Sequence, residues 1–172
     1  VLHEKLSVNY GKNGLTLGFP ATEALYLKQS LEISSKWKTQ PSSIKKIIYA
    51  PHHTIDESKC ALSSFLKFGE IMKEFAKANK GKVQWSFKPH PILRSNLYLH
   101  SDWGRKKTDA YYDFWKEQPY TQLDEGDYYD LFLSSDAIIH DCSSFIVEYA
   151  FTGKPCLYLV NYNNLKGLLN EF

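Results

Sequence analysis

Apolar residues along the chain fall into two alternating patterns, one typical of helices and one typical of buried strands. Over 61–79 they recur every three or four residues with lysine and glutamate largely opposite, which predicts a helix that ends before Gly81. The compact β-branched run 44–50, bounded by Pro51, predicts a buried strand before that helix. The alternation over 83–87 predicts a second strand after it.

The same alternation continues toward the C-terminus. Further helices are predicted over 109–117, 127–135, 143–151 and 164–170, and further strands over 137–140 and 156–160. We interpret 95–122, which mixes aromatic with basic residues, as an aromatic helix packed on the sheet below a solvated basic loop; a binding surface is the alternative. Short apolar strands between helices predict an α/β fold, a Rossmann-like doubly wound parallel sheet.

The N-terminal part of the chain is organised differently. A short apolar run at 15–19 and an amphipathic stretch at 21–31 precede a proline–serine break, so we expect a lead-in strand and helix in 1–40 and the Rossmann-like domain in 41–172. The chain begins at Val1 rather than at methionine and stops directly after a helical segment. We therefore expect a single domain excised from a longer protein, with its C-terminal end truncated.

Composition and charge exclude several classes of protein. The length of 172 residues suits one domain, and a net charge of +2 is too small for a nucleic-acid-binding surface. The three cysteines are widely spaced and form no C-x-x-C pair, which argues against a disulfide framework or a zinc knuckle and favours the reducing cytoplasm. No segment approaches the roughly 20 consecutive apolar residues of a membrane span.

Polar side chains gather where the predicted strands end. They are His52 and His53 after the strand at 44–50, Lys88 and His90 after the strand at 83–87, and Asp141, Ser143 and Ser144 after the strand at 137–140. Doubly wound sheets bind their ligands at the carboxyl ends of the strands. The sequence therefore predicts a ligand site formed by these loops.

The residue types in these loops suit phosphate. Ser143 and Ser144 open a predicted helix, whose free N–H groups attract anions; serines that only cap the helix are the alternative. His90, fixed between two prolines, can donate a hydrogen bond to a pyrophosphate and, when protonated, offset charge on the leaving group. The alternative is a surface histidine satisfied by backbone carbonyls. Lys88 can supply a fixed cation at the same place, or it reaches solvent.

The adjacent histidines raise the question of a metal. In an extended loop His52 and His53 point to opposite sides, so only one of them can face the site, and the sequence leaves open which. Together with His90, Asp141 and Cys142 they contain metal-ligand types, but no H-x-x-x-H, H-E-x-x-H or C-x-x-C spacing is present. We therefore predict no metal.

Other motifs are missing from the chain. It contains no G-x-G-x-x-G, no P-loop and no G-x-S-x-G, which argues against a dinucleotide oxidoreductase, a P-loop NTPase and a hydrolase with a nucleophile elbow. Glu148 lies about one turn into the helix that begins at Ser143. Its carboxylate can accept hydrogen bonds from ribose hydroxyls, or it is a surface helix residue.

Several motifs occur in an order that resembles a known family. They are YAPHH at 49–53, FKPHP at 87–91, YDL at 129–131, SDAIIHDCSSF at 135–145, EYA at 148–150 and TGKP at 152–155. Over 15–160 the chain resembles the nucleotide-binding half of the CDP-glycerol glycerophosphotransferase family, which builds teichoic acid and related capsular polymers on a GT-B scaffold. Two departures are His140 and Cys142, where the family commonly has threonine and tyrosine, and a third is His52 in place of threonine.

The resemblance implies the donor-binding domain of a two-domain, GT-B glycosyltransferase-like enzyme. In this interpretation His90 is the catalytic residue, and the donor is bound by His52, His53, Lys88, Asp141, Ser143, Ser144 and Glu148. The resemblance further implies a nucleotide-linked donor such as CDP-glycerol with no separate cofactor, and a polymer or lipid-linked acceptor held by a missing N-terminal domain. It places the full-length enzyme in the cytoplasm, at the inner face of the membrane.

Several alternatives stay open at this point. The transferred group is glycerol phosphate, ribitol phosphate or a sugar, and we expect no transfer by this chain alone because no second domain brings an acceptor. A non-catalytic nucleotide-binding module is a different class of protein with the same fold. A metal-dependent hydrolase built on His52, His53, His90 and Asp141 is a third possibility.

Overall fold

The structure of the protein is a computed structural model, which describes residues 10, 12, 19–56, 61–141 and 143–161. Four features of the sequence lie outside these residues. They are most of the apolar run predicted as the lead-in strand (15–18), the predicted helix 164–170, Cys60 and Cys142.

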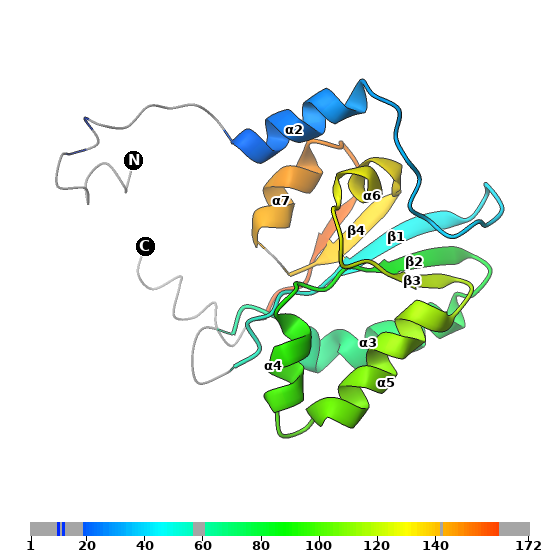
Figure 1. Ribbon diagram of the computed structural model, residues 1–172, viewed down its shortest axis with the longest axis vertical. Helices are drawn as coiled ribbons and strands as arrows, with labels where there is room; N and C mark the ends of the chain where they lie inside the picture. Colours follow the sequence, from blue (N-terminus) through cyan, green and yellow to red (C-terminus); the bar gives the residue numbers. More distant parts are fainter. Residues whose placement is uncertain (1–9, 11, 13–18, 57–60, 142, 162–172) are drawn as a thin grey trace.

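Five parallel strands form one sheet in the order β3-β2-β1-β4-β5 (Figure 1). The strands are β1 (Lys45–Ala50), β2 (Val83–Phe87), β3 (Thr121–Leu123), β4 (Ala137–His140) and β5 (Cys156–Tyr158). The chain moves outward from β1 to β3 and then crosses back to β4 on the other side of β1. This reversal is the topological switch point of a doubly wound sheet, so the predicted fold class is confirmed.

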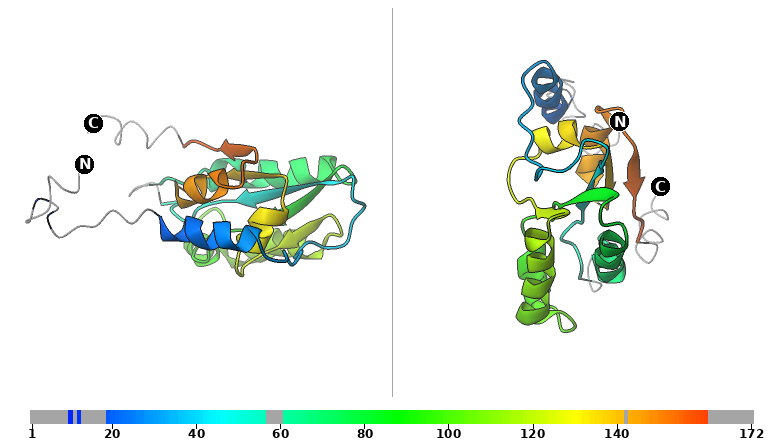
Figure 2. Two further views of the ribbon diagram at one scale, coloured as in Figure 1. Left: turned by 90° about the horizontal axis from the view of Figure 1, so that it is seen from above. Right: turned by 90° about the vertical axis from the view of Figure 1, so that its right-hand side faces the viewer.

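Helices cover both faces of the sheet (Figure 2). One face carries α3 (Phe65–Ala78), α4 (Leu93–Leu99) and α5 (Gly104–Glu117), and the other carries α2 (Pro20–Gln29), α6 (Tyr129–Ser134) and α7 (Ser143–Ala150). Side chains of β1 alternate between the two layers, because Tyr49 packs with the first set of helices and Ile48 with the second. Leu25 of α2 is fully buried in the second layer.

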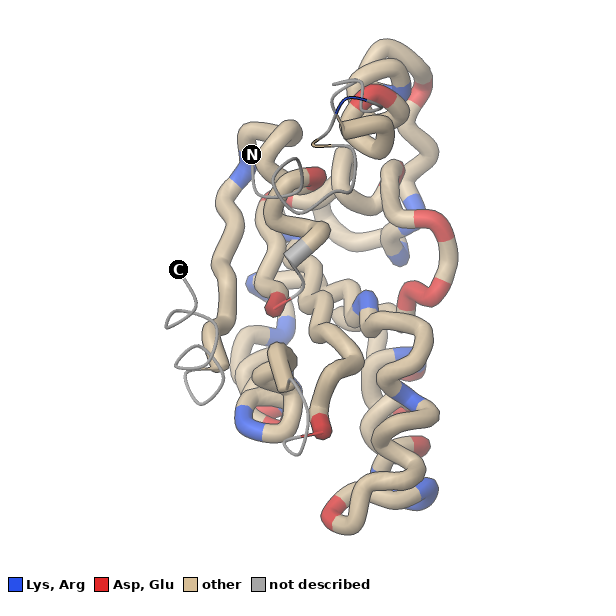
Figure 3. The backbone as a smooth tube through the Cα atoms, turned by 90° about the vertical axis from the view of Figure 1, so that its left-hand side faces the viewer, with Lys and Arg blue, Asp and Glu red and all other residues tan. Residues whose placement is uncertain are grey.

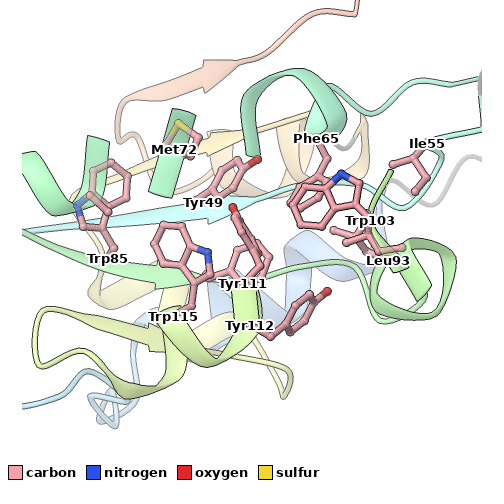
Figure 4. Close-up of a cluster of buried hydrophobic side chains, with 13 residues drawn as sticks. Tyr49, Ile55, Phe65, Met72, Trp85, Leu93, Trp103, Tyr111, Tyr112 and Trp115 are labelled. Atoms are coloured by element: carbon pink, nitrogen blue, oxygen red, sulfur yellow. The ribbon is translucent and has the colours of Figure 1, made fainter. Parts of the chain in front are cut away.

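Aromatic rings fill the layer between the sheet and α5 (Figure 4). The Phe87 and Trp115 rings stack with their centroids 5.2 Å apart, and the Tyr111 hydroxyl donates to the Gly69 carbonyl at 2.8 Å. The interpretation of 95–122 as an aromatic helix packed on the sheet is therefore confirmed. The helix begins at Gly104, five residues before its predicted start at Asp109.

Three further elements differ from the sequence prediction. α4 and β3 were not predicted, and α3 begins at Phe65 rather than at residue 61. β3 is short and polar, but Thr121 is fully buried beside Trp85 of β2, and Gln122 accepts a hydrogen bond from the Lys38 backbone N–H. Tertiary contacts, which a local apolar pattern does not record, make this segment a strand.

Candidate functional site

The loops that follow β2, β1 and β4 meet at the carboxyl end of the sheet. The loop after β2 continues to pair with the loop after β1, since the His90 N–H donates to the Pro51 carbonyl at 3.0 Å. The loop after β1 is joined to β4 by a hydrogen bond from the His52 N–H to Asp141 Oδ1. The strand-end residues predicted to form one site therefore come from three neighbouring loops.

Asp141 holds these loops together. Its Oδ2 accepts hydrogen bonds from the Ser63 hydroxyl (2.9 Å), the Ser64 hydroxyl (2.9 Å) and the Ser64 backbone N–H (2.6 Å). The side chain is 1% exposed. Because both oxygens accept hydrogen bonds within the protein, Asp141 positions these loops, and its predicted contact with the donor stays a prediction. The same bonds hold 63–64 outside the helix and explain why α3 starts at Phe65.

Three histidine rings lie against one another at this end of the sheet. Their centroids are 4.3 Å apart for His52 and His53, 4.1 Å for His53 and His90, and 5.1 Å for His52 and His90. The expectation that His52 and His53 point to opposite sides is wrong because the loop bends at His53, where the Ile55 N–H donates to the His53 carbonyl at 2.9 Å. Both rings therefore lie beside His90.

The His90 ring is a neutral hydrogen-bond donor at pH 7. Burial, followed by the charges of His53, His52 and Lys88, lowers the pKa of His90 to about 4. Its Nδ1 accepts a hydrogen bond from the Ile92 N–H at 3.2 Å, so the proton of the neutral ring is on Nε2. The predicted cationic role of His90 is therefore not supported in this arrangement, whereas a role as an N–H donor is.

His52 is held by its neighbours in the loop. Its Nδ1 lies 2.9 Å from Thr54 Oγ1. Burial lowers the pKa of His52, the positive charge of His53 lowers it further, and the carboxylate of Asp141 opposes both effects. The surroundings of His52 and His90 thus favour uncharged imidazoles.

Lys88 is buried rather than solvent-exposed. Its ammonium donates to the Gly126 carbonyl at 2.6 Å and lies 6.0 Å from the centre of the Tyr128 ring. Burial lowers the pKa of Lys88. The predicted fixed cation is therefore present, but it is directed at the loop that follows β3.

Glu148 is buried on the α7 side of the sheet. The side chain is 5% exposed, so the alternative of a surface helix residue is wrong. The Glu148 carboxylate lies beside the Tyr128 hydroxyl, whose pKa is raised by burial first and by this carboxylate second. Within the described part of the chain, Glu148 Oε2 has no hydrogen-bond partner. Tyr128 did not emerge from the sequence because nothing in its local pattern marks it.

Ser143 is the first residue of α7, and Ser144, which follows it, is exposed. The side chain of Ser143 lies outside what the structure describes. Since α7 begins three residues after the end of β4, its first-turn N–H groups lie at the carboxyl end of the sheet, where the sequence predicted phosphate ligands.

Figure 3 views the molecule from the side of these loops and shows basic and acidic residues interspersed along the described backbone. This distribution agrees with the small net charge of the chain. Of the described helices, none has both the length and the apolar character needed to cross a bilayer.

Comparisons with known proteins give matches in family, sequence and structure. Residues 6–166 match the model of the family described as CDP-Glycerol:Poly(glycerophosphate) glycerophosphotransferase. The chain is 28% identical over 170 residues to the teichoic acid glycerol-phosphate primase of Bacillus spizizenii, covering 94% of this chain and 39% of that protein. It therefore spans about two fifths of the length of this relative.

Among solved structures, the UDP-GlcNAc 2-epimerase of Methanocaldococcus jannaschii aligns with a TM-score of 0.50 and 17% identity, over 88% of this chain and 42% of that chain. The wall teichoic acid polymerase TagF aligns with a TM-score of 0.40 and 18% identity, over 90% of this chain and 30% of that chain. The epimerase likeness indicates a shared fold.

Proposed function

The chain belongs to the CDP-glycerol:poly(glycerophosphate) glycerophosphotransferase family, and from this premise we propose that it binds the nucleotide-linked donor of such a transferase. In this proposal the donor lies at the carboxyl end of the sheet, with its phosphates at the start of α7 and beside His90. The transferred group is a polyol phosphate, and the acceptor is a growing surface polymer.

The observation that carries the proposal is the buried carboxylate of Glu148. A buried carboxylate oxygen with no partner among the described residues costs folding free energy, and a ligand that donates a hydrogen bond to it would recover this cost. Ribose hydroxyls are suitable donors to such an oxygen. The Tyr128 hydroxyl lies beside the same carboxylate.

The proposed chemistry is an in-line displacement at phosphorus. The acceptor hydroxyl gives its proton to a base in the acceptor-binding part of the enzyme as its oxygen forms a bond to the phosphorus that carries the polyol, and the bond from that phosphorus to the bridging oxygen breaks. A nucleoside monophosphate leaves, and its former bridging oxygen gains negative charge. The N–H at His90 Nε2 and the first-turn N–H groups of α7 are suited to stabilise this charge.

The proposal predicts selective stabilisation by cytidine diphosphates. CDP or CDP-glycerol at a concentration 100 times its dissociation constant should stabilise the chain by about 2.7 kcal/mol, which is roughly 5–10 °C in thermal unfolding for a protein of this size. AMP and NAD should give smaller shifts. Equal shifts for all four ligands would contradict the selectivity.

Substitution of His90 tests whether the phosphates lie beside it. In His90→Ala the shift produced by CDP should fall by at least half, because the Nε2 donor is lost. His100→Ala is the matched control, since His100 caps the far end of α4 and should leave the shift unchanged. If CDP raises the unfolding temperature of His90→Ala as much as that of the wild-type chain, the phosphates do not lie beside His90.

A further inference from the structure

The three-histidine cluster combines nitrogen ligands from two separate loops. One potential ligand nitrogen of each of His52, His53 and His90 lies within 4.8 Å of the others. We propose that these three side chains bind a divalent transition-metal ion of the zinc type, and that the bound ion contacts the diphosphate of the donor. The first part stands on the cluster alone, whereas the second part rests on the proposed function.

The geometry is close to that of a three-histidine centre. Zinc–nitrogen bonds of about 2.0–2.1 Å in a tetrahedron put the ligand nitrogens roughly 3.4 Å apart. The present limit of 4.8 Å therefore requires the nitrogens to approach by at most about 1.5 Å. All three side chains are half-buried, so small side-chain rotations can supply this movement.

The backbone beneath the cluster is fixed by neighbours. The His52 N–H is bound by Asp141, the His90 N–H by the Pro51 carbonyl, and the His53 carbonyl accepts from the Asn96 side chain at 2.9 Å. A site built on such anchored backbone needs little rearrangement on binding a metal.

Hydrogen bonds to the rings show which nitrogens can coordinate. His52 Nδ1 lies 2.9 Å from Thr54 Oγ1 and 3.4 Å from the Thr54 backbone N. When Nδ1–H donates to the Thr54 hydroxyl, the 3.4 Å bond from the Thr54 N–H is given up and Nε2 is left for a metal, the usual orientation of a histidine ligand. His90 makes one adjustment. Coordination through Nε2 moves its proton to Nδ1 and exchanges the 3.2 Å bond from the Ile92 N–H for a metal–nitrogen bond.

A metal would supply the charge that the proposed donor site otherwise lacks. Of the charged side chains in the described residues, Lys88 is the cation that acts on His90, and its ammonium donates to the Gly126 carbonyl. Three protein ligands leave a zinc-type ion at least one open position, which a phosphate oxygen can fill. The ion would then neutralise negative charge on the diphosphate, in place of the N–H that His90 Nε2 offers in the metal-free chain.

The first test measures metal binding without nucleotide. The metal-free 172-residue chain is titrated with Zn²⁺ against a chromophoric chelator and with Co²⁺ by visible absorption. We expect one ion per chain with nitrogen ligation. The dissociation constant should rise at least tenfold in His53→Ala and in His90→Ala and stay unchanged in His100→Ala. His53→Gln serves as a second variant in case His53→Ala fails to fold.

Two results overturn the metal site. One is unchanged affinity and stoichiometry in a folded His53 variant. The other is a thiolate-to-cobalt charge-transfer band, which would assign the ion to cysteine.

The second test measures CDP affinity by calorimetry with and without one equivalent of Zn²⁺. We expect at least tenfold tighter CDP binding with the metal in the wild-type chain and no such gain in His53→Ala. An equal CDP affinity with and without metal overturns the contact between the ion and the diphosphate. CDP binding without any metal binding overturns the metal site and leaves the proposed function intact. Metal binding without CDP binding supports the metal site and overturns the proposed function.

Discussion

Replacing Asp141 by Asn will lower the free energy of unfolding by about 2–4 kcal/mol, although the side chain keeps its size. Each carboxylate oxygen accepts a backbone N–H, from His52 at Oδ1 and from Ser64 at Oδ2. An asparagine has one amide nitrogen, which must face one of these N–H groups in either orientation. Hydroxyls can rotate away from such a clash, but backbone N–H groups cannot.

Denaturant titration followed by circular dichroism measures this loss. The matched control is Asp113→Asn on the exposed side of α5, for which we expect a change within about 0.5 kcal/mol. If Asp141→Asn is as stable as the control variant, the network around Asp141 does not hold the loops together.

The second large effect is expected at Glu148, where one substitution should raise stability and weaken CDP binding. Glu148→Gln should raise the free energy of unfolding by about 1 kcal/mol, because a neutral amide replaces a buried carboxylate oxygen that has no hydrogen-bond partner among the described residues. The same substitution should weaken CDP binding about tenfold, since a charged acceptor for the ribose hydroxyls is lost. A purely structural residue would not change stability and binding in opposite directions.

Calorimetry with CDP and 2′-deoxy-CDP isolates the ribose contribution. The wild-type chain should prefer CDP, and Glu148→Gln should lose most of this preference. Glu117→Gln, an exposed change on α5, is the control for both readouts. If the wild-type chain binds both nucleotides with equal affinity, Glu148 does not contact the 2′-hydroxyl of the ribose. The donor-binding proposal then loses the argument from Glu148.

The sheet could be predicted because its central strands are apolar. The runs at 44–50, 83–87 and 137–140 each carry enough buried side chains to stand out locally. β3 could not be predicted in the same way, because Gln122 is a strand residue whose side chain is satisfied by the backbone of residues 36 and 38. That pairing joins segments more than 80 residues apart in the chain.

The sequence predicted which residues lie near one another at the candidate site better than it predicted how they are arranged. Parallel strands bring the loops to one end of the sheet, so their polar residues could be listed from the sequence. The orientation of His53 depends on a bend that no local motif marks. The hydrogen bonds to Asp141 Oδ2 come from Ser63 and Ser64, which the helical pattern placed inside α3. Burial of Glu148 depends on Tyr128, which precedes a different helix.

The bonds to Asp141 also bear on the kinetics of ligand capture. They join segments 77 to 89 residues apart, so the entropy of gathering these loops is lost once, during folding. A nucleotide that arrives later meets a preorganised surface and orders little further backbone. We therefore expect association to be limited by diffusion and orientation rather than by slow loop closure, with differences among nucleotides expressed in how long each one stays bound.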